Sequence, residues 1–134
     1  MGQWLFEQEA KFALTGVIDM EKFEDLKSLT EKEKIILKRC CDAIYQIEPD
    51  AKVILYGSRA RGDSTSESDY DLLIVTNRDL DLEREDIVRR QLFPIELEAG
   101  VVLTVNFYSH QKWDSSLYRA MPFHWNVERD GVIL

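Results

Sequence analysis

The sequence predicts an α+β fold, a small mixed β-sheet flanked by helices, on three observations. A capping box at residues 30–33 opens a helical pattern. Three apolar runs, at 52–56, 70–76 and 101–108, have the length and composition of strands. The elements follow one another in the order α-β-β-α-β-α-α, which allows the helices to pack on one small sheet.

The first predicted helix spans about residues 31–47. Thr30 and Glu33 have the Ser/Thr-x-x-Glu spacing, in which a hydroxyl and a carboxylate satisfy the first free amides of a helix. Pro49 is expected to end the helix. Apolar side chains recur at helical spacing and predict one core-facing stripe, which consists of Ile35, Ile36, Cys40, Ile44 and Ile47.

A second long helix is predicted after Asp81. It is expected to break at or near Pro94, because proline cannot donate to the helical hydrogen-bond ladder. The apolar positions of this helix are Ile87, Val88, Leu92 and Phe93.

The C-terminal quarter begins with a β-branched and aromatic run, Val101–Tyr108, the strongest strand signal in the chain. Ser109 can cap a following helix, and Pro122 can start another that ends before Gly131. We expect residues 1–134 to form one domain. Its parts are an N-terminal helical extension at 1–29, a core at 30–108 and C-terminal helices at 109–134.

The composition is that of a globular protein, with 45% hydrophobic and 31% charged residues. The net charge of −8 disfavours extended nucleic-acid binding, because proteins that follow DNA or RNA usually present a basic face. No apolar stretch approaches the roughly 20 residues that span a bilayer, and the N-terminus lacks a secretion signal pattern. We therefore expect a cytoplasmic protein without membrane association, in which Cys40 and Cys41 are buried small hydrophobes.

The most informative motif spans residues 57–72. A Gly57-Ser58 turn follows one apolar run, and Asp69 and Asp71 open the next. Because side chains alternate along a strand, both carboxylates must project from the same face. Two carboxylates so close together repel each other unless a cation lies between them. The pair therefore predicts a divalent metal site.

The composite of Gly57-Ser58, ten intervening residues and Asp69-Tyr70-Asp71-Leu72 resembles the signature of the nucleotidyltransferase superfamily typified by DNA polymerase beta. Its form, Gly-Ser-Arg-Ala-Arg-Gly followed by Ser-Asp-x-Asp-Leu, is most similar to the minimal nucleotidyltransferases of bacteria and archaea. The resemblance implies a fold like the polymerase beta palm. It also implies a nucleotide-binding enzyme that uses Mg²⁺ (or Mn²⁺) to transfer a nucleoside monophosphate from a nucleoside triphosphate to an acceptor hydroxyl.

The resemblance also implies roles for individual residues. Asp69 and Asp71 would be catalytic and bind the metal. Gly57 and Ser58 would hold the triphosphate, because glycine lets the backbone approach closely while amides and the hydroxyl donate hydrogen bonds. Three further residues are expected to contact the nucleotide: Arg59, Arg61 and Ser68.

A third carboxylate, which this family carries on a neighbouring strand, is missing from the pattern. The polar register of the strand at 101–108 offers Thr104 and Asn106 instead. Both are possible substitutes, although an amide is neither a base nor an anionic ligand. Glu96 and Glu98 could take the position only if their segment folds over the site.

A second hypothesis follows from the missing acid. The chain would then be a catalytically weakened or inactive nucleotide-binding module that acts through a protein partner. Small members of the family often serve as the antitoxin half of a pair with a helical toxin, and an acidic surface with spare aromatic residues suits a protein partner. A homo-oligomer also remains open.

The aromatic residues of the C-terminal segment also allow two interpretations. Trp113, Tyr118, Phe123 and Trp125 either close the core or form a stacking platform for a base or a partner. His110 and His124 are not at metal-ligand spacing and are interpreted as surface or packing residues.

Overall fold

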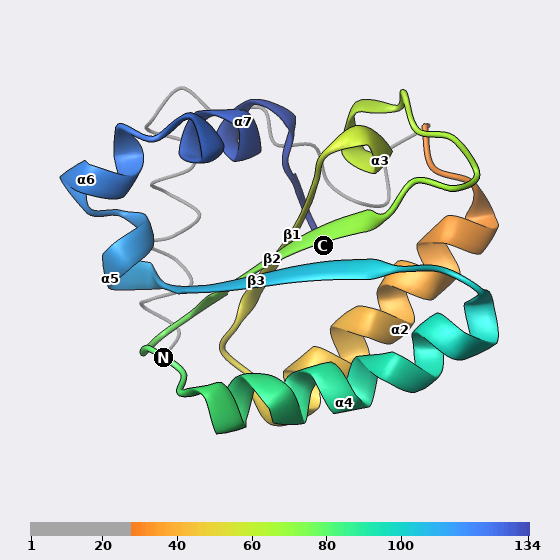
Figure 1. Ribbon diagram of the computed structural model, residues 1–134, viewed down its shortest axis with the longest axis horizontal. Helices are drawn as coiled ribbons and strands as arrows, with labels where there is room; N and C mark the ends of the chain where they lie inside the picture. The colour runs from red at the N-terminus through yellow and green to blue at the C-terminus, as the bar shows by residue number, and fades with distance from the viewer. Residues whose placement is uncertain (1–27) are drawn as a thin grey trace.

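The computed structural model describes residues 28–134, which form a four-stranded sheet in the order β3-β2-β1-β4 (Figure 1). β1 (Lys52–Tyr56) and β2 (Tyr70–Thr76) are antiparallel, whereas β3 (Leu103–Ser109) runs parallel to β2. β4 (Val132–Ile133) lies antiparallel to β1 at the opposite edge. The sheet is therefore mixed, and the predicted α+β class is confirmed.

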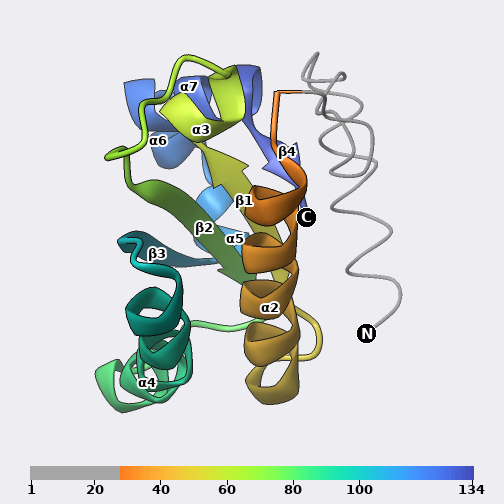
Figure 2. The same cartoon turned by 90° about the vertical axis from the view of Figure 1, so that its right-hand side faces the viewer.

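Helices cover both faces of this sheet. Two long helices lie side by side on one face (Figures 1 and 2), α2 (Glu31–Ile47) and α4 (Leu82–Ala99). The other face is covered by three short helices, α5 (His110–Trp113), α6 (Ser116–Arg119) and α7 (Pro122–Asp130). A single-turn helix, α3 (Ser58–Arg61), follows β1 directly.

The capping box of α2 is present as predicted. The hydroxyl of Thr30 accepts a hydrogen bond from the Glu33 amide at 3.1 Å, and the Glu33 carboxylate accepts one from the Thr30 amide at 3.0 Å. The predicted stripe is wrong at Ile35, which is 61% exposed. The buried face of α2 points away from Ile35. It consists of Ile36, Leu37, Cys40, Cys41 and Ile44.

The predicted break of the second long helix at Pro94 is also wrong, because α4 continues to Ala99. Pro94 is exposed, so the Arg90 carbonyl that loses its helical partner can turn to water. Leu92 and Ile95 are buried on either side of the proline and hold both halves of the helix on the core. Phe93, expected to be an apolar core position, is 55% exposed.

The two faces of the sheet bury separate apolar clusters. On the face of α2 and α4, alternate residues of the central strands such as Leu55, Leu72 and Ile74 are buried. On the opposite face, Leu73 and Val75 pack with residues of α5 and α7. Asp71 belongs by alternation to this second face. The C-terminal helices therefore share a side of the sheet with the aspartate pair.

The C-terminal helices begin and end where the sequence predicts, but the first of them is divided in two. Ser109 caps α5 by accepting a hydrogen bond from the Lys112 amide at 3.2 Å. The helix predicted after Ser109 is divided into α5 and α6, because Ser115 begins a new cap. α7 starts at Pro122 and ends before Gly131, as predicted.

Two further expectations concern the N-terminal extension and membrane-spanning helices. The N-terminal helical extension predicted at 1–29 lies almost wholly outside the described residues. Among residues 28–134, no helix combines the length and apolar character needed to cross a membrane.

Candidate active site

The two aspartates lie where β2 begins, beside both neighbouring strands. Asp71 is opposite Tyr56 of β1 and beside Thr104 of β3. Asp69 is adjacent to the same threonine, whose hydroxyl donates a hydrogen bond to the Asp69 carboxylate at 3.3 Å. Tyr70, between them, is buried on the opposite face. Alternation along β2 thus brings both carboxylates to one side of the sheet.

The electrostatics of the pair favour a bound cation. The pKa of Asp71 is raised above its usual value, first by burial and then by the nearby carboxylate of Asp69. Arg61 opposes this rise but does not cancel it. Carboxylate oxygens are the ligands that Mg²⁺ and Mn²⁺ prefer, so the pair fits such an ion. Within residues 28–134, however, no three acidic, histidine or cysteine side chains gather as a metal-binding group.

The Gly57-Ser58 turn packs directly against this pair. Gly57 has a φ of 76°, and a Cβ atom at this position would collide with the Asp71 carboxylate. Only glycine therefore allows the backbone to pass so close to the acid. The chain then enters α3 at Ser58 and leaves it at Gly62, which has a φ of 85°.

Arg59 is enclosed by contacts with the protein itself. Its buried guanidinium pairs with Glu33 of α2 at 3.0 Å and donates to the Ser68 carbonyl at 2.8 Å. It also lies over the ring of Tyr70, 4.3 Å from the centroid. These contacts indicate that Arg59 holds the loop before Asp69, and its expected contact with a nucleotide stays a prediction.

Arg61 and Ser68 surround the site more loosely. The Arg61 side chain is half exposed, donates to Asp63 at 3.2 Å and lies 3.7 Å from the Asp130 carboxylate. Ser68 uses its hydroxyl to accept a hydrogen bond from the Thr65 amide at 2.9 Å. Arg61 is therefore the more accessible of the two motif arginines.

The neighbouring strand β3 brings two uncharged side chains to the side of the sheet that carries the aspartates. Asn106 donates from Nδ2 to the Tyr56 hydroxyl at 2.8 Å, and Thr104 is bonded to Asp69. Neither glutamate considered from the sequence replaces them. Glu96 accepts from the Leu103 amide at 2.8 Å, and Glu98 pairs with Arg39 at 2.9 Å.

Sequence reasoning missed three residues around the site. Tyr56 contacts Asn106, and Glu33 and Tyr70 surround Arg59. Glu33 was recognisable only as a capping residue, and its second carboxylate oxygen carries the extra contact. The position of Tyr56 just before the Gly57 turn was the one available signal for its presence at the site.

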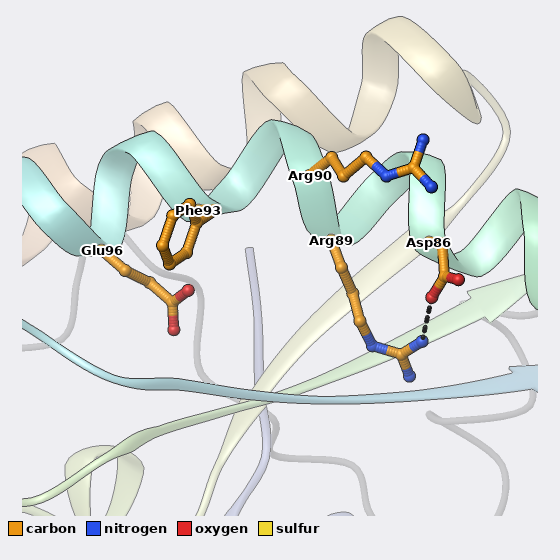
Figure 3. Close-up of a pocket in the computed structure, with 5 residues that line it drawn as sticks. All are labelled: Asp86, Arg89, Arg90, Phe93 and Glu96. Carbon is orange, nitrogen blue, oxygen red and sulfur yellow. Dashed lines mark ion pairs between the residues drawn. The ribbon is translucent and has the colours of Figure 1, made fainter.

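A separate hollow of about 350 Å³ lies on α4 (Figure 3). Its lining residues are Asp86, Arg89, Arg90, Phe93 and Glu96. The Arg89 guanidinium lies 5.0 Å from the centroid of the Phe107 ring. Phe107 packs with the cluster on the α2 and α4 face, so this hollow is on the other side of the sheet from the aspartates.

Comparison with known proteins decides the family. Residues 33–119 match the family described as nucleotidyltransferase domain. The chain belongs to the nucleotidyltransferase domain family. The matched segment of this nucleotidyltransferase includes both aspartates, the Gly57-Ser58 turn and Asn106, and the resemblance to minimal nucleotidyltransferases is confirmed.

A relative of this nucleotidyltransferase occurs in Methanocaldococcus jannaschii. It is named "Putative protein adenylyltransferase MJ0604" and is 39% identical over 83 residues. The aligned region covers 62% of this chain and 76% of the relative. Together with the family match, it supports nucleotidyl transfer as the general activity.

Proposed function

We propose that this nucleotidyltransferase binds a nucleoside triphosphate with Mg²⁺ (or Mn²⁺) and transfers a nucleoside monophosphate to an acceptor hydroxyl. One observation carries the proposal: Asp69 and Asp71 share a face of β2, and the Gly57 backbone lies against the Asp71 carboxylate. A name given to a relative, protein adenylyltransferase, favours ATP as donor and a protein hydroxyl as acceptor. We further propose a cytoplasmic location, where both are available.

The roles of the residues follow from their positions. Asp69 and Asp71 would hold the metal, which when bound neutralises phosphate charge and favours in-line attack at the α-phosphorus. Gly57 would let the backbone approach the phosphate oxygens closely, and the hydroxyl of Ser58 can donate to them. Arg61 is accessible enough to add a guanidinium contact. Catalysis in such a site is mainly positioning and electrostatics.

Proton removal from the acceptor is the weak step. Asn106 has no basic atom, and losing a general base typically costs ~10²–10⁴ in rate. We therefore expect slow turnover.

The test is transfer of label from ATP carrying a radioactive α-phosphate. The purified protein is incubated with Mg²⁺ or Mn²⁺ and with candidate protein acceptors, and other triphosphates serve as competitors. Asp69→Asn and Asp71→Asn should each abolish labelling, because each removes an anionic ligand without changing shape. Asp42→Asn, on the exposed side of α2, should label as the wild type does. Absence of both labelling and triphosphate binding in the wild type would overturn the proposal.

The second candidate function is that of a catalytically weakened or inactive nucleotide-binding module that acts on a protein partner, such as a helical toxin. The favouring observation is the uncharged third position, where Asn106 is bonded to Tyr56. Asp69→Ala/Asp71→Ala separates the two functions. A binding module with these substitutions should still neutralise its partner, whereas an enzyme should not.

A further inference from the structure

The hydrogen bond between Tyr56 and Asn106 crosses the central strand of the site. Tyr56 lies on β1 opposite Asp71, and Asn106 lies on β3 beside Leu73. Since β2 separates β1 from β3, the 2.8 Å contact between the two side chains passes over β2 between Asp71 and Leu73. This Tyr56–Asn106 bridge thus forms the boundary between the carboxylates and the apolar cluster of that face.

The bridge is held firmly on the tyrosine side. The Tyr56 ring packs edge-on against Phe123 of α7, with centroids 5.3 Å apart. A fixed hydroxyl that accepts from Nδ2 sets the amide plane of Asn106 and determines where its carbonyl oxygen lies.

The remaining atom of the amide is available to a ligand. Among the interactions of residues 28–134, the Asn106 carbonyl oxygen has no hydrogen-bond donor, whereas its Nδ2 is engaged by Tyr56. An amide oxygen is an acceptable neutral ligand for Mg²⁺ or Mn²⁺. Thr104 is the other candidate. Its hydroxyl donates a hydrogen bond to the Asp69 carboxylate, so we assign it to orienting Asp69.

We propose that Tyr56 is a positioning residue that orients Asn106, so that the Asn106 carbonyl oxygen supplies the third, neutral ligand beside Asp69 and Asp71. The inference rests on the proposed metal-dependent function. It makes the site doubly rather than triply negative. Tyr56 then acts as a residue that hydrogen-bonds a metal ligand from outside the coordination sphere. Loss of such a residue typically lowers metal affinity roughly 10–100-fold.

The experiment measures Mn²⁺ affinity of the nucleotide-free protein by electron paramagnetic resonance. Tyr56→Phe keeps the ring against Phe123 and removes only the hydroxyl, so it should weaken binding about 10-fold or more. Asn106→Leu should weaken binding at least as much. Tyr56→Phe should add no further loss in the Asn106→Leu background, because the phenol acts only through the amide. Asn106→Asp should tighten binding by adding a charge.

The control is Tyr45→Phe, which removes a phenol bonded to the Leu134 carbonyl at 3.4 Å, on the other side of the sheet. It should leave Mn²⁺ affinity unchanged. Thermal unfolding of each variant distinguishes lost positioning from lost folding. If Tyr56→Phe unfolds, Asn106→Asp with Tyr56 in place still tests the third position.

Two results would overturn this inference but not the proposed function. One is wild-type Mn²⁺ affinity in Tyr56→Phe. The other is that Tyr56→Phe lowers Mn²⁺ affinity equally in the wild-type and Asn106→Leu backgrounds. In either case a wild type that binds Mn²⁺ and labels an acceptor leaves the proposed function standing. A wild type that binds no Mn²⁺, with or without ATP, overturns both. Unchanged affinity in Asn106→Asp, with the fold intact, also contradicts the third position.

Discussion

At the scale of single residues, Gly57 brings the backbone against the Asp71 carboxylate. Its φ of 76° and ψ of −160° lie in a region that is nearly exclusive to glycine, and a side chain would collide with Asp71. We expect Gly57→Ala to destabilise the protein by more than ~1–3 kcal/mol, the usual cost of a residue held in a sparsely populated backbone region, and to weaken Mn²⁺ binding. Urea unfolding and metal titration measure the two effects.

Gly100 provides the matched control for this substitution. Its φ is also positive, at 67°, but a Cβ atom there would meet nothing within 4 Å. Gly100→Ala should therefore show a backbone cost without any change in metal affinity. Equal effects of both substitutions on metal binding would contradict the close approach to Asp71.

Arg59 has a structural role that the sequence did not predict, because it joins α2 to the loop before Asp69. Its ion pair with Glu33 is almost enclosed, with side-chain exposures of 9% and 14%. Arg59→Lys keeps the charge but loses the forked contact to the Ser68 carbonyl. We expect a loss of unfolding free energy of ~1–3 kcal/mol, the cost of leaving an enclosed acceptor without its donors.

The comparison for Arg59→Lys is Arg39→Lys, at an exposed pair with Glu98. Such surface pairs contribute about 0–1 kcal/mol, so this variant should unfold as the wild type does. If Arg59→Lys also unfolds as the wild type does, the network does not hold the loop.

At the scale of elements, α4 contains Pro94 in its interior, where other residues donate a backbone hydrogen bond. Pro94→Ala restores the amide that can donate to the Arg90 carbonyl, and proline in a helix interior costs ~3 kcal/mol relative to alanine. We expect Pro94→Ala to raise the midpoint of thermal unfolding. A lower midpoint would show that the helix depends on the geometry the proline imposes.

The sequence was most informative where structure is local. Both strands that flank the motif, Lys52–Tyr56 and Tyr70–Thr76, have the predicted bounds, because short apolar runs and the Gly57 turn define them within a few residues. The continuation through Pro94 was missed, because burial of residues on both sides outweighs one lost hydrogen bond. β4 is too short to have a pattern of its own and exists through pairing with β1.

The local part of the site was also predictable from the sequence. The aspartates and the Gly57 turn are neighbours in sequence, so their proximity could be inferred. The Tyr56–Asn106 bridge and the burial of Arg59 depend on the register of three strands and on the docking of α2, which no local pattern specifies.

At the scale of the whole molecule, the C-terminal helices add a pH-sensitive contribution to stability. His124 of α7 is buried and stacks on Trp113 of α5, with ring centroids 4.3 Å apart. Its pKa is lowered from the ordinary 6.5, first by burial and then by Arg119, against the opposing effect of Asp114. The unfolded chain therefore takes up a proton more readily than the folded one, and stability should fall as the pH drops below 6.5.

His124→Phe tests this contribution, because an aromatic ring can keep the stacking on Trp113 without a titratable group. The difference in unfolding free energy between wild type and variant should shift in favour of the variant as the pH falls from 7 to 5. Glu128, which lies 3.5 Å from His124 and has a raised pKa, is present in both proteins, so the difference reports the imidazole together with its coupling to Glu128. A difference that does not vary with pH would contradict the prediction.

The Tyr56–Asn106 bridge has a consequence for how this chain can change over generations. The codons for asparagine and aspartate differ only in their first base. An aspartate at position 106 would meet a phenol that is already in place to donate a hydrogen bond to it. A single base substitution therefore separates this chain from a third carboxylate, without any rebuilding of the surrounding structure.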